Sequence, residues 1–403
     1  MMKFSVLLPT RNRLELLKYA VETVRRQDYD DWEIIISDNY SEDDIAGYVR
    51  SLNEPRIKYY RTESFIPVTD NWNNALEKST GDYVIMLGDD DCLMKGFFTT
   101  TRRLIETYQK PDFIYSKAFL YAYPGVLPDF PNGFLKSYDF AAFFKSATEP
   151  FWLRREQALD LVHQSMNLDM ALTYNMQHSI VNRAFIDRLR YKGNFFQSPY
   201  PDFYATNVLL LKAERVLICP YPLITVGISP KSFGFYHFNK REDEGAEFLK
   251  NLADPASAER LRQIILPSGP KDRTAWLIAM DTIKANYGAE FNLRVNYNRY
   301  RYLQIIAIYG KYYPGSKAQI SELQRLLYWW EKIIYVPFVV IAGNLRKMLP
   351  QGVYKSVVSK LSKIIVKTTE FDTAKSEDCY NNILEVFDKV DPLKHQLRSF
   401  DSQ

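Results

Sequence analysis

Three consecutive aspartates, Asp89, Asp90 and Asp91, follow the apolar run at residues 83–87 after a single glycine, Gly88. Carboxylates roughly 5 Å apart in an effective dielectric of about 20 repel each other by about 3 kcal/mol per pair, so a positive group should offset them. Mg²⁺ and Mn²⁺ take oxygen ligands and commonly complete their shell with substrate phosphates. A cation held here with a diphosphate would stabilise the charge on a departing phosphate. The competing interpretation is an acidic, solvated turn that binds nothing.

The elements that must position these aspartates alternate along the chain. Apolar runs typical of buried strands are separated by amphipathic segments typical of helices. We expect strands at 4–9, 32–38, 56–61 and 82–87, with helices at 14–27, 42–52 and 71–79 between them. Helical crossovers of this length join parallel strands and cover both faces of a sheet. The sequence therefore predicts an α/β fold with an open, largely parallel sheet.

Polar residues follow the first, second and fourth of these expected strands. They are Thr10-Arg11-Asn12, Asp38-Asn39 and the three aspartates. In open α/β sheets, ligands bind outside the carboxyl ends of the strands, where helix N-termini also face anions. Neither a GxGxxG nor a GxxxxGK[ST] segment is present, which excludes a dinucleotide fingerprint and a P-loop.

Composition narrows the setting of the protein. A net charge of +4 over 403 residues argues against a dedicated nucleic-acid surface. Three widely spaced cysteines form no metal-binding pattern, and the apolar stretch near the N-terminus is too short for a signal peptide. We therefore expect a reducing, cytoplasmic location.

Three segments in order, FSVLLPTRNR, WEIIISDNYSED and NWNNALEKSTGDYVIMLGDDD, resemble the N-terminal half of the glycosyltransferase family 2 enzymes with the GT-A fold. The likeness runs over about residues 3–95 and continues more faintly to about 235. The resemblance implies a nucleotide-diphospho-sugar donor and a divalent metal, Mn²⁺ or Mg²⁺.

The resemblance also assigns roles to individual residues. The family's motif is usually DxDD with a metal ligand at its third position; here Gly88 takes the first position, which implies that Asp90 binds the metal. Asp89 and Asp91 would assist, although they also form a DxD one residue out of step. The implied nucleotide contacts are Pro9, Thr10, Arg11, Asp38 and Asn73.

The family supplies its general base about a hundred residues past the metal loop, often as Glu-Asp. Here Asp202 stands at that place, preceded by Pro201, and it could equally cap the helix that follows. Further on, Lys231 and Ser232 lie in a loop that could close over the diphosphate. His237 lies in the same loop, but a lone histidine beside aromatic residues is more often structural.

From about residue 240 the composition shifts to helical patterns, so we expect a catalytic domain at 1–238 and a helical region at 239–403. The uncharged stretch Ile333 to Leu345 is shorter than the roughly twenty residues that span a bilayer. Residues 346–367 include several Lys and Arg residues and no Asp or Glu, a pattern typical of helices that lie on anionic membranes. Packing on the protein's own domain explains the amphipathic pattern equally well.

The function expected from this sequence is a metal-dependent, non-processive, inverting glycosyltransferase. It would move one sugar from a nucleotide-diphospho-sugar to a hydroxyl of a glycan or lipid-linked saccharide, in the cytoplasm or peripherally on the inner face of the membrane. The QxxRW motif of the family's polymerising members is absent. Two alternatives stay open. One is a sugar nucleotidyltransferase, although the loop after the first strand lacks the glycines usual in such enzymes. The other is a non-catalytic carbohydrate-binding or scaffold protein, because Gly88 replaces the first carboxylate of the usual metal motif.

Overall fold

The computed structural model describes residues 2–138, 141–230, 232–239, 255–266, 269–312, 317–337 and 379–392. The chain forms two compact units. The first contains Met1–Val162, Ala171–Leu252 and Ala374–Gln403, and the second contains His163–Met170 and Ala253–Thr373.

The first unit is built on one ten-stranded sheet in the order β3-β2-β1-β4-β9-β6-β10-β5, with β7 paired to β6 and β8 to β10. Its first four strands are parallel and fall where the apolar runs predict them. They are β1 (Phe4–Thr10), β2 (Trp32–Asp38), β3 (Ile57–Arg61) and β4 (Tyr83–Met86). β2 is buried along its whole length, as expected for a strand covered on both faces.

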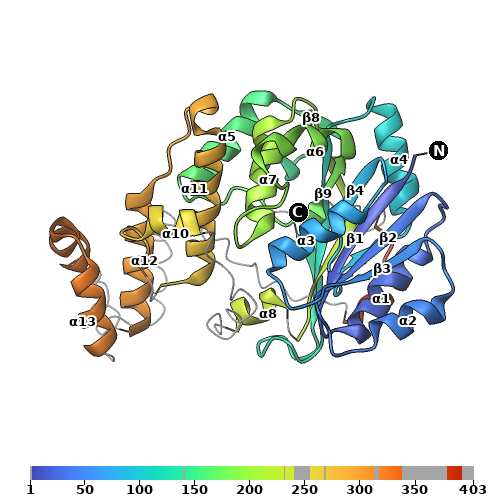
Figure 1. The fold of residues 1–403 in the computed structure, drawn as a ribbon, viewed down its shortest axis with the longest axis horizontal. Helices are drawn as coiled ribbons and strands as arrows, with labels where there is room; N and C mark the ends of the chain where they lie inside the picture. Colours follow the sequence, from blue (N-terminus) through green and yellow to red (C-terminus); the bar gives the residue numbers. More distant parts are fainter. Residues whose placement is uncertain are drawn as a thin grey trace. The chain divides into compact units, whose positions relative to one another are not determined.

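The crossover helices are α1 (Leu14–Arg25), α2 (Ile45–Leu52) and α3 (Val68–Lys78). The chain moves outward from β1 to β3 and then returns to β4 on the other side of β1. Because such crossovers are right-handed, α1 and α2 lie on one face of the sheet and α3 on the other (Figure 1). The strand order thus reverses between β1 and β4, which is where open α/β sheets bind ligands.

Beyond β4 the sheet becomes mixed. β9 (Ser179–Asn182) runs antiparallel to both β4 and β6 (Phe113–Ala122), and β10 (Val216–Ile228) runs parallel to β6. β5 (Cys92–Leu93) comes directly after the aspartates and pairs antiparallel with β10. The α/β prediction is confirmed, with the parallel order concentrated in the first four strands. The remaining strands are β7 (Phe134–Tyr138) and β8 (Phe151–Leu153).

Further helices of the first unit pack around this second half of the sheet. They are α4 (Phe97–Thr107), α5 (Arg155–Met166, which runs into the second unit), α6 (Arg183–Leu189), α7 (Pro201–Lys212) and α8 (Phe233–Phe238), with short 3₁₀ turns η1 (Ala142–Phe144), η2 (Met176–His178) and η3 (Arg190–Lys192).

The described part of the second unit is helical, as the sequence predicts for the C-terminal region. Its helices are α10 (Pro255–Leu261), α11 (Lys271–Phe291), α12 (Tyr297–Tyr312) and α13 (Lys317–Leu326). Arg301 and Glu331 form a buried ion pair at 2.6 Å, which neutralises both charges inside the unit. α12 and α13 pack together through an apolar cluster that includes Ile305 and Leu323.

The division of the chain differs from the expected boundary between residues 238 and 239. Residues 374–403 belong to the first unit, where α16 (Ile383–Lys389) buries Val386 and Phe387. α16 packs on α1 and β5, and Arg26 pairs with Asp388 at 2.5 Å. A seven-residue helix is too short for its sequence pattern to indicate which domain it contacts.

No described helix is long and apolar enough to cross a membrane. The basic segment at 346–367 lies outside the described residues.

Candidate functional site

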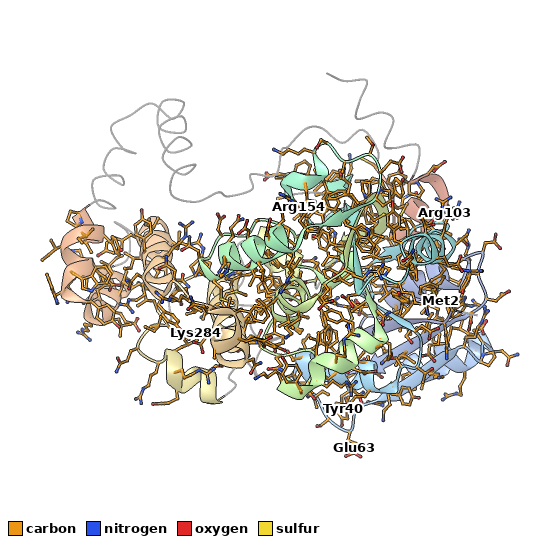
Figure 2. The ribbon with its side chains drawn as sticks, turned by 90° about the horizontal axis from the view of Figure 1, so that it is seen from above. Met2, Tyr40, Glu63, Arg103, Arg154 and Lys284 are labelled. Carbon is orange, nitrogen blue, oxygen red and sulfur yellow. The ribbon has the colours of Figure 1, made fainter. Side chains whose placement is uncertain are left out.

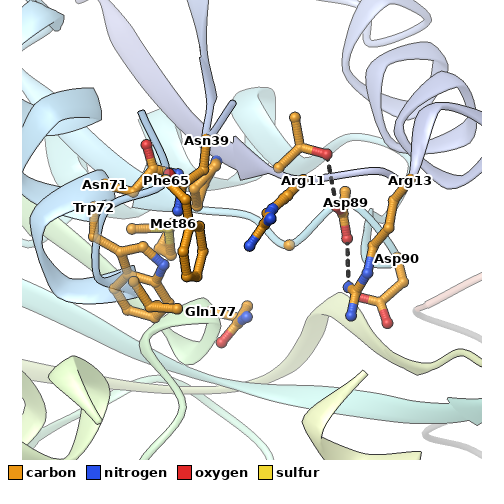
Figure 3. Close-up of a pocket in the computed structure, with 14 residues that line it drawn as sticks. Arg11, Arg13, Asn39, Phe65, Asn71, Trp72, Met86, Asp89, Asp90 and Gln177 are labelled. Atoms are coloured by element: carbon orange, nitrogen blue, oxygen red, sulfur yellow. Dashed lines mark hydrogen bonds and ion pairs between the residues drawn. The ribbon is translucent and has the colours of Figure 1, made fainter. Parts of the chain in front are cut away.

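A pocket opens where the strand order reverses, at the carboxyl ends of β1 and β4 (Figure 3). Figure 2 shows Tyr40 and Glu63, which follow β2 and β3, on the same edge of the first unit, while Met2, before β1, lies away from them. The pocket is lined by Pro9, Thr10, Arg11, Arg13, Asn39, Phe65, Val68, Asn71, Trp72, Met86, Gly88, Asp89, Asp90 and Gln177.

One side of the pocket is aromatic. The Arg11 guanidinium lies 3.7 Å from the centre of the Phe65 ring, and Trp72 is held edge to face against Phe196 at 5.2 Å. Asn39 fixes the loop that carries Phe65, because its amide donates to the Ile66 carbonyl at 2.8 Å and accepts from the Ile66 N–H at 2.9 Å. Flat rings beside a cation suit a planar, anionic ligand such as a nucleotide.

The other side of the pocket contains the acidic loop, Asp89 to Asp91, and the positively charged residue that pairs with it, Arg13. Asp89 accepts hydrogen bonds from Thr10 Oγ1 at 2.7 Å and from Arg13 Nη1 at 2.8 Å, and Arg13 also lies 4.0 Å from Asp90. Burial by itself lowers the pKa of Arg13, but the carboxylates of Asp89 and Asp90 outweigh it and hold the pKa above the usual arginine value. Arg13 is therefore a positive group that partly offsets the three aspartates.

Asp91 serves to fix the loop. Its two oxygens accept from the backbone N–H groups of Gly88 and Gly227, both at 2.8 Å, and from Gln177 Nε2 at 3.0 Å. A side chain at position 88 would place its Cβ 2.5 Å from Asp91 Oδ2. Gly88 therefore stands where the usual motif has a carboxylate because the carboxylate of Asp91 fills that space. Burial, reinforced by Asp90, raises the pKa of Asp91 to about 7.

Asp90 faces the pocket with acceptor capacity to spare. It accepts from Ser229 Oγ at 2.5 Å, while Oδ1 faces Arg13 only at 4.0 Å. Burial raises the pKa of Asp90, and the charge of Arg13 opposes that rise. Within the described residues, no group of three or more His, Cys, Asp or Glu side chains converges on one point. One carboxylate that borders the pocket nevertheless fits Mg²⁺ or Mn²⁺, which take one or two protein carboxylates and complete the shell with phosphates and water.

Asp202 lies in the first turn of α7, outside the pocket lining. Tyr200 takes the N-cap position, and Asp202 Oδ1 accepts from the N–H of Phe203 at 3.0 Å. Burial raises the pKa of Asp202 to about 7. Burial raises the pKa of the Tyr138 hydroxyl, and the carboxylates of Asp202 and Asp91 raise it further.

Other residues implied by the resemblance lie around the pocket without lining it. Asp38 is buried at the end of β2 and accepts from the Tyr59 hydroxyl at 2.7 Å. Asn73 is buried on α3, where its amide exchanges hydrogen bonds with the backbone of Phe196 at 2.9 and 3.2 Å. Asn73 therefore ties α3 to the segment that leads to Asp202.

The loop after β10 is only partly described. Ser232 Oγ accepts from the N–H of Phe235 at 3.2 Å and donates to the Ser229 carbonyl at 3.0 Å, so it holds the start of α8. Lys231 lies outside the described residues. His178 is structural: burial lowers its pKa to about 4, and its ring stacks on Tyr115 at 5.2 Å.

The structure thus brings Pro9, Thr10, Arg11, Asp89 and Asp90 together, as expected, and adds residues that the sequence did not single out. Arg13 could have been found, since it lies in the same loop as Arg11. Gln177 comes from the short 3₁₀ turn η2, 86 positions after Asp91, and no pattern in the sequence points to it.

The first unit has an open α/β sheet, a pocket where the strand order reverses, an aromatic side to that pocket and an acidic loop. These are the features of an α/β domain that binds a ligand at the carboxyl ends of its strands. Residues 5–148 match the sequence model of the family described as "Glycosyl transferase family 2". The resemblance read from the three segments is confirmed.

Individual relatives match over the same N-terminal part. The chain is 40% identical over 103 residues to the GalNAc(5)-diNAcBac-PP-undecaprenol beta-1,3-glucosyltransferase of Campylobacter jejuni, covering 25% of this chain and 33% of that protein. It is 26% identical over 87 residues to the UDP-Glc:alpha-D-GlcNAc-diphosphoundecaprenol beta-1,3-glucosyltransferase WfgD of Escherichia coli, covering 22% and 34%. The matched part of the chain thus spans about a third of the length of these curated relatives. Among solved structures, S. aureus TarS 1-349 in complex with UDP-GlcNAc matches 77% of this chain and 93% of that one, at 16% identity and a TM-score of 0.48.

Proposed function

We propose that the protein is a metal-dependent, inverting, non-processive glycosyltransferase. It moves one sugar from a nucleotide-diphospho-sugar to a hydroxyl of a glycan, most specifically of a lipid-linked saccharide. The observation that carries the proposal is the pocket between the ends of β1 and β4, in the part of the chain that matches the family 2 model, where Arg11 lies on Phe65 and Arg13 pairs with Asp89.

The donor lies along this pocket with its base toward Phe65 and its diphosphate toward Asp90. The Arg11 guanidinium and the Phe65 ring form one surface that suits a base and a phosphate together. Asp90 is the metal-binding residue, since Asp89 and Asp91 already have two and three hydrogen-bond donors. A bound Mn²⁺ or Mg²⁺ would neutralise the charge that develops on the departing diphosphate.

Asp202 is the general base. As the acceptor oxygen attacks the anomeric carbon, the Asp202 carboxylate takes the hydroxyl proton, and the bond from that carbon to the diphosphate breaks on the opposite face. A base works best when its pKa lies near the operating pH, and burial places that of Asp202 at about 7. Asn73 supports it by holding the segment before α7 through Phe196.

The acceptor class is taken from the relatives. Both relatives named above carry undecaprenol-linked diphosphates in their names, so we assign a lipid-linked saccharide as the acceptor. Such a substrate is held at a membrane surface, and the helical residues 329–337 expose Trp329 at 74% and Ile333 at 65%, one helical turn apart. An apolar face of this kind, followed in sequence by the basic residues 346–367, suits an anionic bilayer.

Two experiments test the proposed function. Purified protein is screened against UDP-, GDP- and dTDP-sugars with Mn²⁺, Mg²⁺ or EDTA, and slow release of nucleoside diphosphate is measured. We expect one donor class to be hydrolysed only with metal; no hydrolysis of any donor, and no binding of any nucleotide, would refute the enzyme assignment.

Membrane contact is tested by flotation with vesicles of phosphatidylglycerol and phosphatidylcholine. The full chain should float with the anionic vesicles, and the double variant Trp329→Ser, Ile333→Ser should float less. Equal flotation of both proteins would remove these two residues from the proposed membrane surface.

A further inference from the structure

Gln177 lines the pocket, and its amide is oriented by one hydrogen bond. Its Nε2 donates to Asp91 Oδ2 at 3.0 Å, and Asp91 is itself fixed by the N–H groups of Gly88 and Gly227. The reverse orientation of the amide would place Oε1 against a carboxylate oxygen, which is repulsive. Oε1 therefore faces away from Asp91, and among the contacts of the described residues it accepts no hydrogen bond.

The chemistry of Oε1 limits what can bind there. An amide oxygen accepts hydrogen bonds but cannot donate them, and it is neutral. A phosphate oxygen is an acceptor as well, so it gains nothing from Oε1 and is better served by Arg11 and Arg13. The complementary ligand group is a donor, such as a hydroxyl.

The position of Gln177 indicates which part of the donor carries that hydroxyl. Gln177 borders the pocket together with Gly88 and Asp90, across from Arg11 (Figure 3). Its element, η2, also contacts α7, where Thr206 Oγ1 donates to the Tyr174 carbonyl at 3.4 Å just before η2.

The transferred sugar must lie between the diphosphate and the base, because bond making and bond breaking occur at its anomeric carbon. η2 lies between the acidic loop, through the Gln177–Asp91 bond, and α7, which carries Asp202. We propose that Gln177 Oε1 accepts a hydrogen bond from a hydroxyl of the donor's sugar and so helps to determine which sugar is transferred. This inference rests on the proposed function and assigns a sugar contact within it.

The test compares a donor with its sugar-free counterpart. UDP-glucose and UDP are titrated by calorimetry in the presence of Mn²⁺, because one relative named above uses UDP-Glc. Two variants are used: Gln177→Leu removes both polar atoms, and Gln177→Lys keeps a donor for Asp91 but has no acceptor. We expect Gln177→Leu to bind UDP-glucose about tenfold more weakly and UDP within about twofold of wild type; in Gln177→Lys, whose charge also attracts the diphosphate, the affinity for UDP-glucose relative to UDP should fall by about the same tenfold.

The outcomes separate this inference from the proposed function. If the variants bind UDP-glucose as tightly as wild type, Gln177 does not contact the sugar. If UDP and UDP-glucose weaken equally in both variants, Gln177 acts only by holding Asp91, and the inference is wrong while the proposed function stands. If wild-type protein binds none of the UDP-, GDP- and dTDP-sugars or their nucleoside diphosphates, the proposed function fails first and the sugar contact falls with it.

Discussion

Buried carboxylates occur at both ends of the same parallel strands, and the protein treats them differently. At the amino end, Glu33 on β2 accepts from Lys3 at 2.9 Å, from Lys58 at 2.7 Å and from Ser5 at 2.7 Å. Burial raises the pKa of Glu33, but these hydrogen bonds outweigh burial and lower it to about 2. At the carboxyl end, three aspartates share the nearby charge of Arg13, and the pKa of Asp91 rises to about 7.

The difference separates Glu33, which stabilises the fold, from the aspartates to which we assign ligand binding. Two lysines neutralise Glu33 completely, so no positive ligand is needed at the amino end. A single arginine cannot neutralise three carboxylates. The ionised acidic loop therefore destabilises the fold unless a cation binds to it. In the proposed function, the end of the sheet with the unneutralised carboxylates is the end that binds the metal and the donor.

The largest expected effect is on Asp90. Asp90→Ala should lower metal-dependent donor hydrolysis by about a thousandfold, because the carboxylate that faces the pocket is lost. Asp30→Asn is the matched control, since that carboxylate is fully exposed and 3.7 Å from Arg56. Nucleoside diphosphate release is measured for both; an Asp90→Ala variant as active as the control would contradict a metal role for this loop.

Asp202 should have the next largest effect, and it brings a pH dependence. Its folded pKa is raised to about 7, so the base is protonated below that pH and ionised above it. Wild-type turnover should therefore rise with pH up to about 7 and then level off. Asp202→Asn should lower turnover by about a hundredfold or more and remove that rise. A variant that keeps the wild-type pH profile would mean that another group takes the proton.

Replacing Glu33 tests the structural side of the comparison. Glu33→Gln should leave donor hydrolysis unchanged but destabilise the fold by about 2 kcal/mol at pH 7, or about thirtyfold in the unfolding equilibrium, because two lysines lose their partner. The contribution of Glu33 is present above its unfolded pKa of 4.5 and is lost as the pH falls toward 2. Urea unfolding at pH 7 and at pH 3 measures this; a destabilisation that does not shrink at pH 3 would point to packing instead.

The sequence predicted the first half of the sheet closely, because β1, β2 and β4 are centred on apolar runs and β1, β2 and β3 are each followed by a helix. It predicted the second half poorly, because β9 has four residues and β5 has two, and their directions depend on tertiary pairing. The acidic loop could also be predicted from the sequence, because its three charged residues are consecutive. Gln177 was missed because its role depends on a contact with Asp91, 86 positions away.

The smallest expected effect concerns Gly88, where the loop departs from the usual motif of its family. Gly88→Asp restores the missing carboxylate in sequence, yet its Cβ would lie 2.5 Å from Asp91 Oδ2 and 3.2 Å from Asp90 Oδ1. We expect the variant, and Gly88→Ala with it, to bind the donor about tenfold more weakly, because Asp91 must move and release Gly227. Gly288→Ala on α11 is the control, since its nearest neighbour there is the flexible side chain of Lys284 at 3.2 Å. Donor binding measured by calorimetry decides: if Gly88→Asp binds as well as wild type, Asp91 is not tied to position 88, and the loop can adopt the arrangement of the usual motif.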